Sequence, residues 1–380
     1  MGPATVLLLL LLATTASALT IATKKYLPAR YAASGAVALD GSPYAYYVSP
    51  GEKGKLVIYQ KGGGWCYSDE ECAARALTEL GSSNNTFLPP QIVFEQFAET
   101  AHFELLFSNA SVSPLTASFT KIFLPYLDGS SQTSDLDGPV AVGGQRIYYR
   151  GARIHRATVE TLLAAEGLAG ATDVILAGGS AGGLATYLHA DSWRSAILAT
   201  SPAAKVVAVP DSGFFLNYNS SHARTFGAAM RWVFNRANGT GGVPAACLAA
   251  NAADPALCIF AEEVAKTLVT PVFALQSTYD SFQVSAILQE PPGNATAVNA
   301  YGALLAARVA ADLLASSPNH GVFLDSCFHH VAEWNEITID GQTVSSALAT
   351  FYASVGTPGA KRVWAQGRAY PCKACCTNGQ

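Results

Sequence analysis

The sequence has 380 residues, of which 50% are hydrophobic and 13% are charged, and its formal net charge is −4. A chain so rich in apolar residues and so poor in charge is not intrinsically disordered. It has no basic excess and no Lys/Arg cluster, which argues against nucleic acid as a partner. The length fits one large domain with a deep core.

The chain opens with a segment typical of a secretory signal peptide. Leu7–Leu12 is an apolar run, and Ala16-Ser17-Ala18 fits the small-residue pattern of a cleavage site. The run is too short to cross a bilayer, which takes about 20 apolar residues. We therefore expect residues 1–18 to be a signal peptide and residues 19–380 to form one domain. We also expect the protein to be secreted, with no membrane span.

Six short apolar runs rich in β-branched residues follow along the chain. They are residues 56–59, 122–124, 174–176, 206–209, 272–275 and 322–324. Short, continuously apolar runs suit strands that are buried on both faces. Helix-compatible stretches lie between them, notably 153–166 and 303–314. This alternation predicts an α/β fold with a mostly parallel central sheet flanked by helices.

Small or reactive residues follow every one of these runs. The segments are Gly62–Trp65, Asp128–Ser131, Gly178–Gly183, Asp211–Gly213, Tyr279-Asp280 and Ser326–His330. In open α/β sheets, binding and catalytic sites form at the carboxyl ends of the strands. We therefore expect these loops to meet at one edge of the sheet and to form the site there.

Gly178-x-Ser180-x-Gly182 matches the pattern of a nucleophile elbow, a tight strand-to-helix turn that exposes a serine. Small residues beside the serine avoid clashes with the neighbouring strand and helix. The pattern follows a predicted strand and precedes the helix-compatible run 184–189, which favours Ser180 as a nucleophile. Ala181 then begins the helix, where its N–H is free to donate to an oxyanion.

A serine nucleophile needs a base, and histidine is the usual one. His329 and His330 follow the last predicted strand, and the residues alone do not separate them. His320 is more typical of an ordinary loop residue. Adjacent histidines do not readily share one metal ion, and the sequence has no H-E-x-x-H motif, so a metal site here is the weaker interpretation.

The acid that orients the base comes between serine and histidine in enzymes built on such an elbow. Asp280 directly follows the fifth predicted strand, whereas Asp325 and Asp211 are the alternatives. The Gly62–Gly64 loop after the first strand is similar to the glycine-rich loops whose N–H groups bind a developing oxyanion. A phosphate-binding loop is less consistent with the sequence, because no Lys-Ser/Thr follows the glycines.

The eight cysteines and five glycosylation sequons agree with secretion. Cys66/Cys72 and Cys247/Cys258 are close enough in sequence to close small loops, although spacing does not establish connectivity. Cys372-x-x-Cys375 lacks the second ligand pair of a zinc site. The N-x-[ST] sequons predict glycosylation at one or more of Asn84, Asn109, Asn219, Asn238 and Asn294.

Several motifs taken together are more specific than any one of them. They are Gly62–Cys66, Asp128–Ser131, Arg150-Gly151, Gly178–Gly183, Asp211–Phe215, Tyr279–Gln283 and Ser326–His330. In this order they resemble the pectin acetylesterase/Notum family of secreted serine carboxylesterases. The resemblance runs from about residue 36 to residue 376. It implies a single-domain fold similar to the α/β-hydrolases.

The resemblance also implies roles for individual residues. Ser180 would be the nucleophile, Asp280 the acid and His330 the base, because the register of Ser326-Cys327-Phe328-x-His330 favours His330 over His329. Backbone N–H groups would form the oxyanion hole, and side chains within the motifs are pocket candidates. The oxyanion-hole residues are Gly63, Gly64 and Ala181; the pocket candidates are Trp65, Asp128 and Gln283.

The sequence departs from the plant members of the family at three positions. Those members carry Glu where Lys61 stands, and Cys where Leu127 and Gly179 stand. The two missing cysteines imply a different set of disulfides. The change at Lys61 bears on the surroundings of the oxyanion loop, and none of the three touches the predicted triad.

The plant-type motifs match best and imply an esterase that removes O-acetyl groups from a cell-wall or extracellular polysaccharide such as pectin. A Notum-like deacylase that removes a fatty acyl group from a protein is the alternative within the family. The sequence does not reveal the depth of the acyl pocket that would separate them. A non-catalytic binding protein on a hydrolase scaffold is the alternative from another class. We expect a monomer that uses no metal and no organic cofactor.

Overall fold

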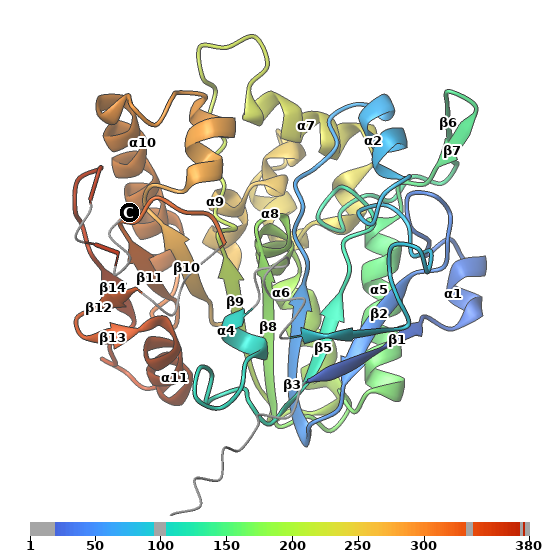
Figure 1. The fold of residues 1–380 in the computed structure, drawn as a ribbon, viewed down its shortest axis with the longest axis horizontal. Coiled ribbons are helices and arrows are strands. Elements are labelled where there is room, and N and C mark those ends of the chain that lie inside the picture. The colour runs from blue at the N-terminus through green and yellow to red at the C-terminus, as the bar shows by residue number, and fades with distance from the viewer. Residues whose placement is uncertain (1–19, 95–103, 332–336, 373–374, 377–380) are drawn as a thin grey trace, which may run out of the picture.

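A ten-stranded sheet runs through the centre of the computed structural model (Figure 1). The structure describes residues 20–94, 104–331, 337–372 and 375–376, so the predicted signal peptide lies outside the described residues. The strands of the sheet are β1 (Ile21–Tyr26), β2 (Ala45–Ser49), β3 (Glu52–Gln60), β4 (Gln91–Val93), β5 (Phe119–Leu124), β8 (Asp173–Gly179), β9 (Lys205–Asp211), β10 (Phe273–Ser277), β11 (Gly321–Asp325) and β14 (Val363–Ala365).

The order of strands in the sheet is β14-β11-β10-β9-β8-β3-β5-β2-β1-β4. The strands from β14 to β5 are parallel, and β2, β1 and β4 continue the sheet with antiparallel pairing. All six predicted runs lie in the parallel part, which confirms the predicted fold class. The antiparallel edge was not predicted, because β1 is mostly exposed and has no continuous apolar run.

Helices flank the sheet, and short 3₁₀ and π segments connect them. The α-helices are α1 (Ala29–Ala33), α2 (Asp69–Arg75), α4 (Glu104–Phe107), α5 (Gly151–Ala165), α6 (Ala181–Thr200), α7 (Phe226–Arg236), α8 (Ala245–Ala250), α9 (Ala261–Val264), α10 (Ala295–Arg308) and α11 (Val344–Ser354). The 3₁₀ segments are η1 (Gly239–Gly242), η2 (Pro255–Ile259) and η3 (Ala265–Thr267), and the π segments are η4 (Gln283–Leu288) and η5 (Val309–Leu314). Two hairpins complete the fold: β6 (Val140–Val142) with β7 (Gln145–Ile147), and β12 (Thr338–Ile339) with β13 (Gln342–Thr343).

The predicted helices are present, with one displaced boundary. The stretch 153–166 corresponds to α5, and 184–189 lies inside α6. The stretch 303–314 is only the second half of a longer segment, since α10 begins at Ala295. The Asn294 side chain accepts a hydrogen bond from the N–H of Ala297 and so caps this earlier start.

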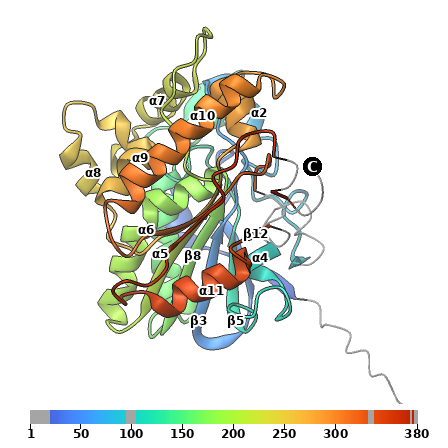
Figure 2. The same cartoon turned by 90° about the vertical axis from the view of Figure 1, so that its left-hand side faces the viewer.

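The two faces of the sheet are covered by different helices, as the alternation of side chains along β10 demonstrates. Phe273 stacks on Phe351 of α11, with ring centroids 4.9 Å apart. Ala274 instead belongs to the apolar cluster that contains Val264 of α9 and Leu305 of α10. Figure 2 shows α5 and α6 on one side of the sheet and α4 on the other. Both faces are therefore buried, which explains why the parallel strands are continuously apolar.

One helical segment among the described residues, 295–314, is long and apolar enough to cross a membrane by length and composition. Val298 and Leu305 of this segment are buried in the same cluster as α9. Arg308 forms ion pairs with Glu262 at 3.0 Å and with Asp312 at 2.9 Å. These contacts hold one face of the segment against the protein core.

Candidate active site

The turn from β8 to α6 holds Ser180 in a strained conformation. Its φ is 57° and its ψ is −123°, a region that a residue with a Cβ rarely adopts. The turn is so tight that a Cβ on Gly182 would lie 2.0 Å from the carbonyl oxygen of Gln60 on β3. A Cβ on Gly178 would lie 2.3 Å from the carbonyl oxygen of Gly182. These distances give the physical reason for the glycines of the predicted elbow.

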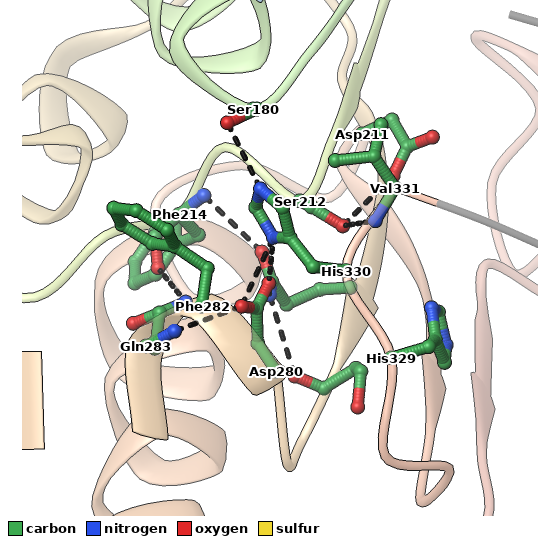
Figure 3. Close-up of polar contacts among 12 residues, drawn as sticks. Ser180, Asp211, Ser212, Phe214, Asp280, Phe282, Gln283, His329, His330 and Val331 are labelled. Carbon is green, nitrogen blue, oxygen red and sulfur yellow. Dashed lines mark hydrogen bonds and ion pairs between the residues drawn. The ribbon is translucent and has the colours of Figure 1, made fainter. Parts of the chain in front are cut away.

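Ser180, His330 and Asp280 form a continuous hydrogen-bonded chain (Figure 3). The Oγ of Ser180 lies 2.9 Å from Nε2 of His330, and Nδ1 of His330 lies 2.8 Å from Oδ2 of Asp280. A carboxylate accepts a hydrogen bond from Nδ1–H, which leaves Nε2 as the acceptor for the serine hydroxyl. The arrangement can therefore remove the serine proton while Asp280 stabilises the resulting imidazolium.

The carboxylate of Asp280 is fully buried and held from several directions. The backbone N–H of Gln283 donates to Oδ1 at 3.0 Å, and the side-chain amide of Gln276 donates to Oδ2 at 3.3 Å. The side chain of Gln283 is itself fixed, since it donates to the carbonyl of Phe214 at 3.2 Å and accepts from Tyr301 at 2.8 Å. Gln283 thus supports the loop that carries Asp280.

The neighbouring histidine, His329, has a different partner. Its Nε2 lies 3.1 Å from Oδ1 of Asp325, which is fully buried at the end of β11. Burial by itself lowers the pKa of His329, but the charge and hydrogen bond of Asp325 outweigh it and raise the pKa to about 9. Geometry therefore separates the two histidines that the residues alone did not: Figure 3 shows only His330 directed at Ser180.

The remaining alternatives for the base and the acid form no hydrogen bond with the side chain of Ser180 or His330 among the described residues. His320 precedes β11, at the opposite end of the strand from the site, and its Nδ1 accepts from the N–H of Val272 at 3.2 Å. Asp211 is at the end of β9, where its carbonyl accepts from the N–H of Ser180 at 2.9 Å. Its carboxylate accepts from Ser212 at 3.0 Å. Asp325 is paired with His329.

The glycine-rich loop after β3 lies directly against the elbow. A Cβ on Gly62 would lie 2.9 Å from the Cβ of Ser180. Gly63 and Gly64 both have positive φ, 139° and 65°, which fits the loop to glycine. Arg75 at the end of α2 donates to the carbonyl of Gly63 at 2.9 Å and so fixes the orientation of this peptide. Ala181 is the first residue of α6, so its N–H lies outside the helical ladder.

A cavity of about 310 Å³ opens above Ser180. Its wall includes Ser180, His330, Gly63, Lys61, Glu79 and Leu80. The sequence predictions did not include Glu79 and Leu80, and they placed Lys61 near the oxyanion loop without assigning it to the pocket. The position of Lys61 directly before the glycines was an available signal. Glu79 and Leu80 follow α2 and reach the cavity only through tertiary packing, for which the sequence carried no signal.

The predicted pocket candidates are not on this wall. Trp65 is buried beneath it, where its Nε1 donates to Ser131 at 2.9 Å and its ring meets Phe215 edge-on at 5.1 Å. Asp128 is buried in its own turn; burial raises its pKa, and hydrogen bonds from Ser130 and Gln132 oppose this. Gln283 lies under Asp280. All three follow strands as expected, but they are buried behind the cavity wall, where they form contacts that fix the loops.

Four disulfides join all eight cysteines. Cys66–Cys72 and Cys247–Cys258 are the two short-range pairs that the spacing suggested. Cys372 and Cys375 pair with each other, which removes the two thiolates on which the zinc alternative rested. Cys327–Cys376 links the loop after β11 to the C-terminal segment. No group of three potential metal ligands occurs within the described ranges.

The fold, a mostly parallel sheet with a serine, histidine and carboxylate joined at its carboxyl edge, is of the α/β-hydrolase type. The relatives of the chain show that it is a carboxylic-ester hydrolase. Residues 17–377 match the family described as Pectinacetylesterase, and the chain belongs to this family. The resemblance inferred from the motifs is thereby confirmed. Pectin acetylesterase 11 of Arabidopsis thaliana is 30% identical over 335 residues, which cover 81% of this chain and 80% of that protein.

Two deacylases are more distant relatives. The palmitoleoyl-protein carboxylesterase NOTUM of Mus musculus is 29% identical over 267 residues, 65% of this chain and 48% of that protein. Among solved structures, the Wnt deacylase Notum from Drosophila superposes with a TM-score of 0.76 at 21% identity. The superposition covers 93% of this chain and 99% of that chain, and it concerns the fold.

Proposed function

We propose that this chain is a secreted serine carboxylesterase that removes O-acetyl groups from a cell-wall or extracellular polysaccharide such as pectin. The observation that carries the proposal is the Ser180–His330–Asp280 chain of hydrogen bonds at the floor of an open cavity. Membership of the pectinacetylesterase family supports the acetyl ester as substrate. We expect the enzyme to act as a monomer.

Acylation begins when the Oγ of Ser180 attacks the ester carbonyl and its proton passes to Nε2 of His330. Backbone N–H groups of Gly63, Gly64 and Ala181 stabilise the negative charge on the carbonyl oxygen of the tetrahedral intermediate. The C–O bond to the sugar then breaks, and His330 returns the proton to the departing sugar hydroxyl. The product is an acetyl ester on Ser180.

Deacylation repeats these steps with water in place of the sugar hydroxyl. His330 takes a proton from the water as its oxygen attacks the acetyl carbonyl, and the same N–H groups stabilise the second intermediate. The bond to Ser180 breaks, Oγ recovers its proton from His330, and acetate leaves. Asp280 remains ionised throughout and keeps the imidazole in the required tautomer.

The dimensions and lining of the cavity support a short acyl group. A long acyl chain needs a deep apolar cavity. The space above Ser180 measures about 310 Å³, and its wall carries the charged residues Lys61 and Glu79. This lining favours a small, polar substrate over a fatty acyl group, and it supports polysaccharide deacetylation over protein deacylation.

Secretion is supported by the predicted signal peptide and by the surface chemistry of the chain. Four disulfides require an oxidising compartment to persist. All five sequon asparagines are exposed and therefore accessible to glycosylation; they are Asn84, Asn109, Asn219, Asn238 and Asn294. A decrease in mass on enzymatic removal of N-glycans from the secreted protein would be the expected result.

The test of the proposed function is acetate release from acetylated pectin, compared with acetylated xylan and chitin. We expect wild type to favour pectin, and Ser180→Ala to lose at least ~10³-fold in rate. Ser34→Ala, at an exposed serine beyond α1, is the matched control. An alanine variant at position 180 as active as wild type would exclude the serine mechanism. A strong preference for p-nitrophenyl octanoate over the acetate would favour the deacylase alternative.

A further inference from the structure

A lysine without a partner lies in the wall of the active-site cavity. Lys61 directly follows β3, and its backbone N–H donates to the carbonyl of Leu124 at 3.0 Å. A Cβ on Gly182 would lie 2.8 Å from the Lys61 carbonyl oxygen, so this residue touches the elbow that carries Ser180. Its ammonium makes no hydrogen bond and no ion pair with any residue in the described part of the chain.

The charges around Lys61 do not neutralise it. Burial lowers its pKa, the carboxylate of Glu79 opposes that effect, and the guanidinium of Arg75 adds to it. Arg75 donates through Nε to the carbonyl of Leu80 and through Nη1 to the carbonyl of Gly63, whereas its Nη2 has no hydrogen-bond partner among the described residues. Glu79 is exposed and forms no ion pair within 4.0 Å among the described residues.

A half-buried ammonium is costly to keep without hydrogen-bond acceptors, and an anion in the cavity would supply them. Ser180, which attacks the ester, lines the same cavity as Lys61. An anion bound by Lys61 and the ester cleaved by Ser180 would therefore belong to the same substrate. A uronic acid satisfies this requirement, because one sugar ring carries both hydroxyl groups that can be acetylated and a carboxylate.

We infer that Lys61 binds the free carboxylate of a uronate in the substrate and thereby directs the enzyme to acetylated uronates that are not methyl-esterified. The inference rests on the proposed function and refines it, since it names which acetylated polysaccharide fits the site. Glu79, on the same cavity wall, competes with the substrate carboxylate for the Lys61 ammonium. The two side chains therefore have opposite effects on selectivity.

The experiment compares acetate release from two polymers with the same acetylation, polygalacturonate with free carboxyl groups and its methyl ester. The measured quantity is the ratio of kcat/KM for the free acid to kcat/KM for the methyl ester, with p-nitrophenyl acetate as a reference. We expect Lys61→Gln to lower this ratio about tenfold, as loss of one charge-assisted hydrogen bond does. We expect Glu79→Gln to raise it a few-fold.

Lys53→Gln is the matched control. Lys53 is exposed near the start of the same strand, at the end remote from the cavity. The ratio should be unchanged in this variant. An equal decrease in both lysine variants would overturn the inference in favour of general electrostatic attraction between the protein and the polymer.

The remaining outcomes separate the inference from the function on which it rests. If Lys61→Gln lowers the rate on both polymers and on p-nitrophenyl acetate alike, Lys61 only positions the oxyanion loop. The inference is then wrong and the esterase function stands. If wild type cleaves p-nitrophenyl acetate through Ser180 but releases no acetate from either polymer, the polysaccharide function fails, and the inference fails with it.

Discussion

Substituting His329 by Gln tests whether the structure holds a buried cation next to His330, the proposed catalytic base. The side chain of His329 is 10% exposed and that of Asp325 is 0% exposed. Burial disfavours the imidazolium, but Asp325 and, more weakly, Asp211 and Asp280 raise the pKa to about 9. Glutamine retains a hydrogen-bond donor but cannot carry the positive charge.

The magnitude follows from the difference between the folded and unfolded pKa values. The rise from 6.5 to about 9 corresponds to about 3 kcal/mol, at roughly 1.4 kcal/mol for each pH unit. Because the folded pKa is the higher one, this stabilisation is fully present below pH 6.5 and is lost as the pH rises through 9. The difference in unfolding free energy between wild type and His329→Gln should therefore be largest in mild acid and should shrink by about 3 kcal/mol in alkali.

The assay is urea unfolding of the disulfide-intact protein at about pH 6, 8 and 10, followed by tryptophan fluorescence. His222→Gln is the control, because His222 is exposed and forms no ion pair with a carboxylate among the described residues. The control should differ from wild type by the same small amount at every pH. A His329→Gln difference that stays constant or grows with pH would refute the reasoning.

Three further predictions concern the triad, the elbow and a disulfide. Asp280→Asn should reduce kcat for p-nitrophenyl acetate about 10⁴-fold, because an amide holds the imidazole in the wrong tautomer; a loss below tenfold would contradict this role. Gly182→Ala should yield little folded protein, since its Cβ would lie 2.0 Å from the carbonyl oxygen of Gln60, and normal expression would count against the tight turn. Cys376→Ser opens a link between positions 49 apart, so the free energy of unfolding should fall by roughly 4 kcal/mol, whereas an unchanged Tm would argue against the Cys327–Cys376 bridge.

The strands and the residues that follow them were readable from the sequence because both depend on local chemistry. Strand segments buried on two faces must be continuously apolar, as β3 is over Leu56–Tyr59 and β8 over Val174–Ala177. The elbow around Ser180 leaves a sequence pattern because its backbone excludes side chains at fixed positions. The antiparallel edge was not predicted: β1 is mostly exposed and β4 has only three residues, and β2, although buried, pairs with β1 and β5 through contacts that the sequence pattern does not mark.

The sequence by itself determined the fold class, the family and the identity of the candidate triad, because each rests on motifs of adjacent residues. Only the tertiary structure decided what lines the cavity. Trp65 and Gln283 follow strands as a pocket residue should, yet they are buried in a supporting layer. Glu79 reaches the wall from the segment after α2, and no residue in the described part of the chain pairs with the Lys61 ammonium there. Contacts between segments far apart in the chain depend on packing in three dimensions, which the order of residues along one strand or loop does not encode.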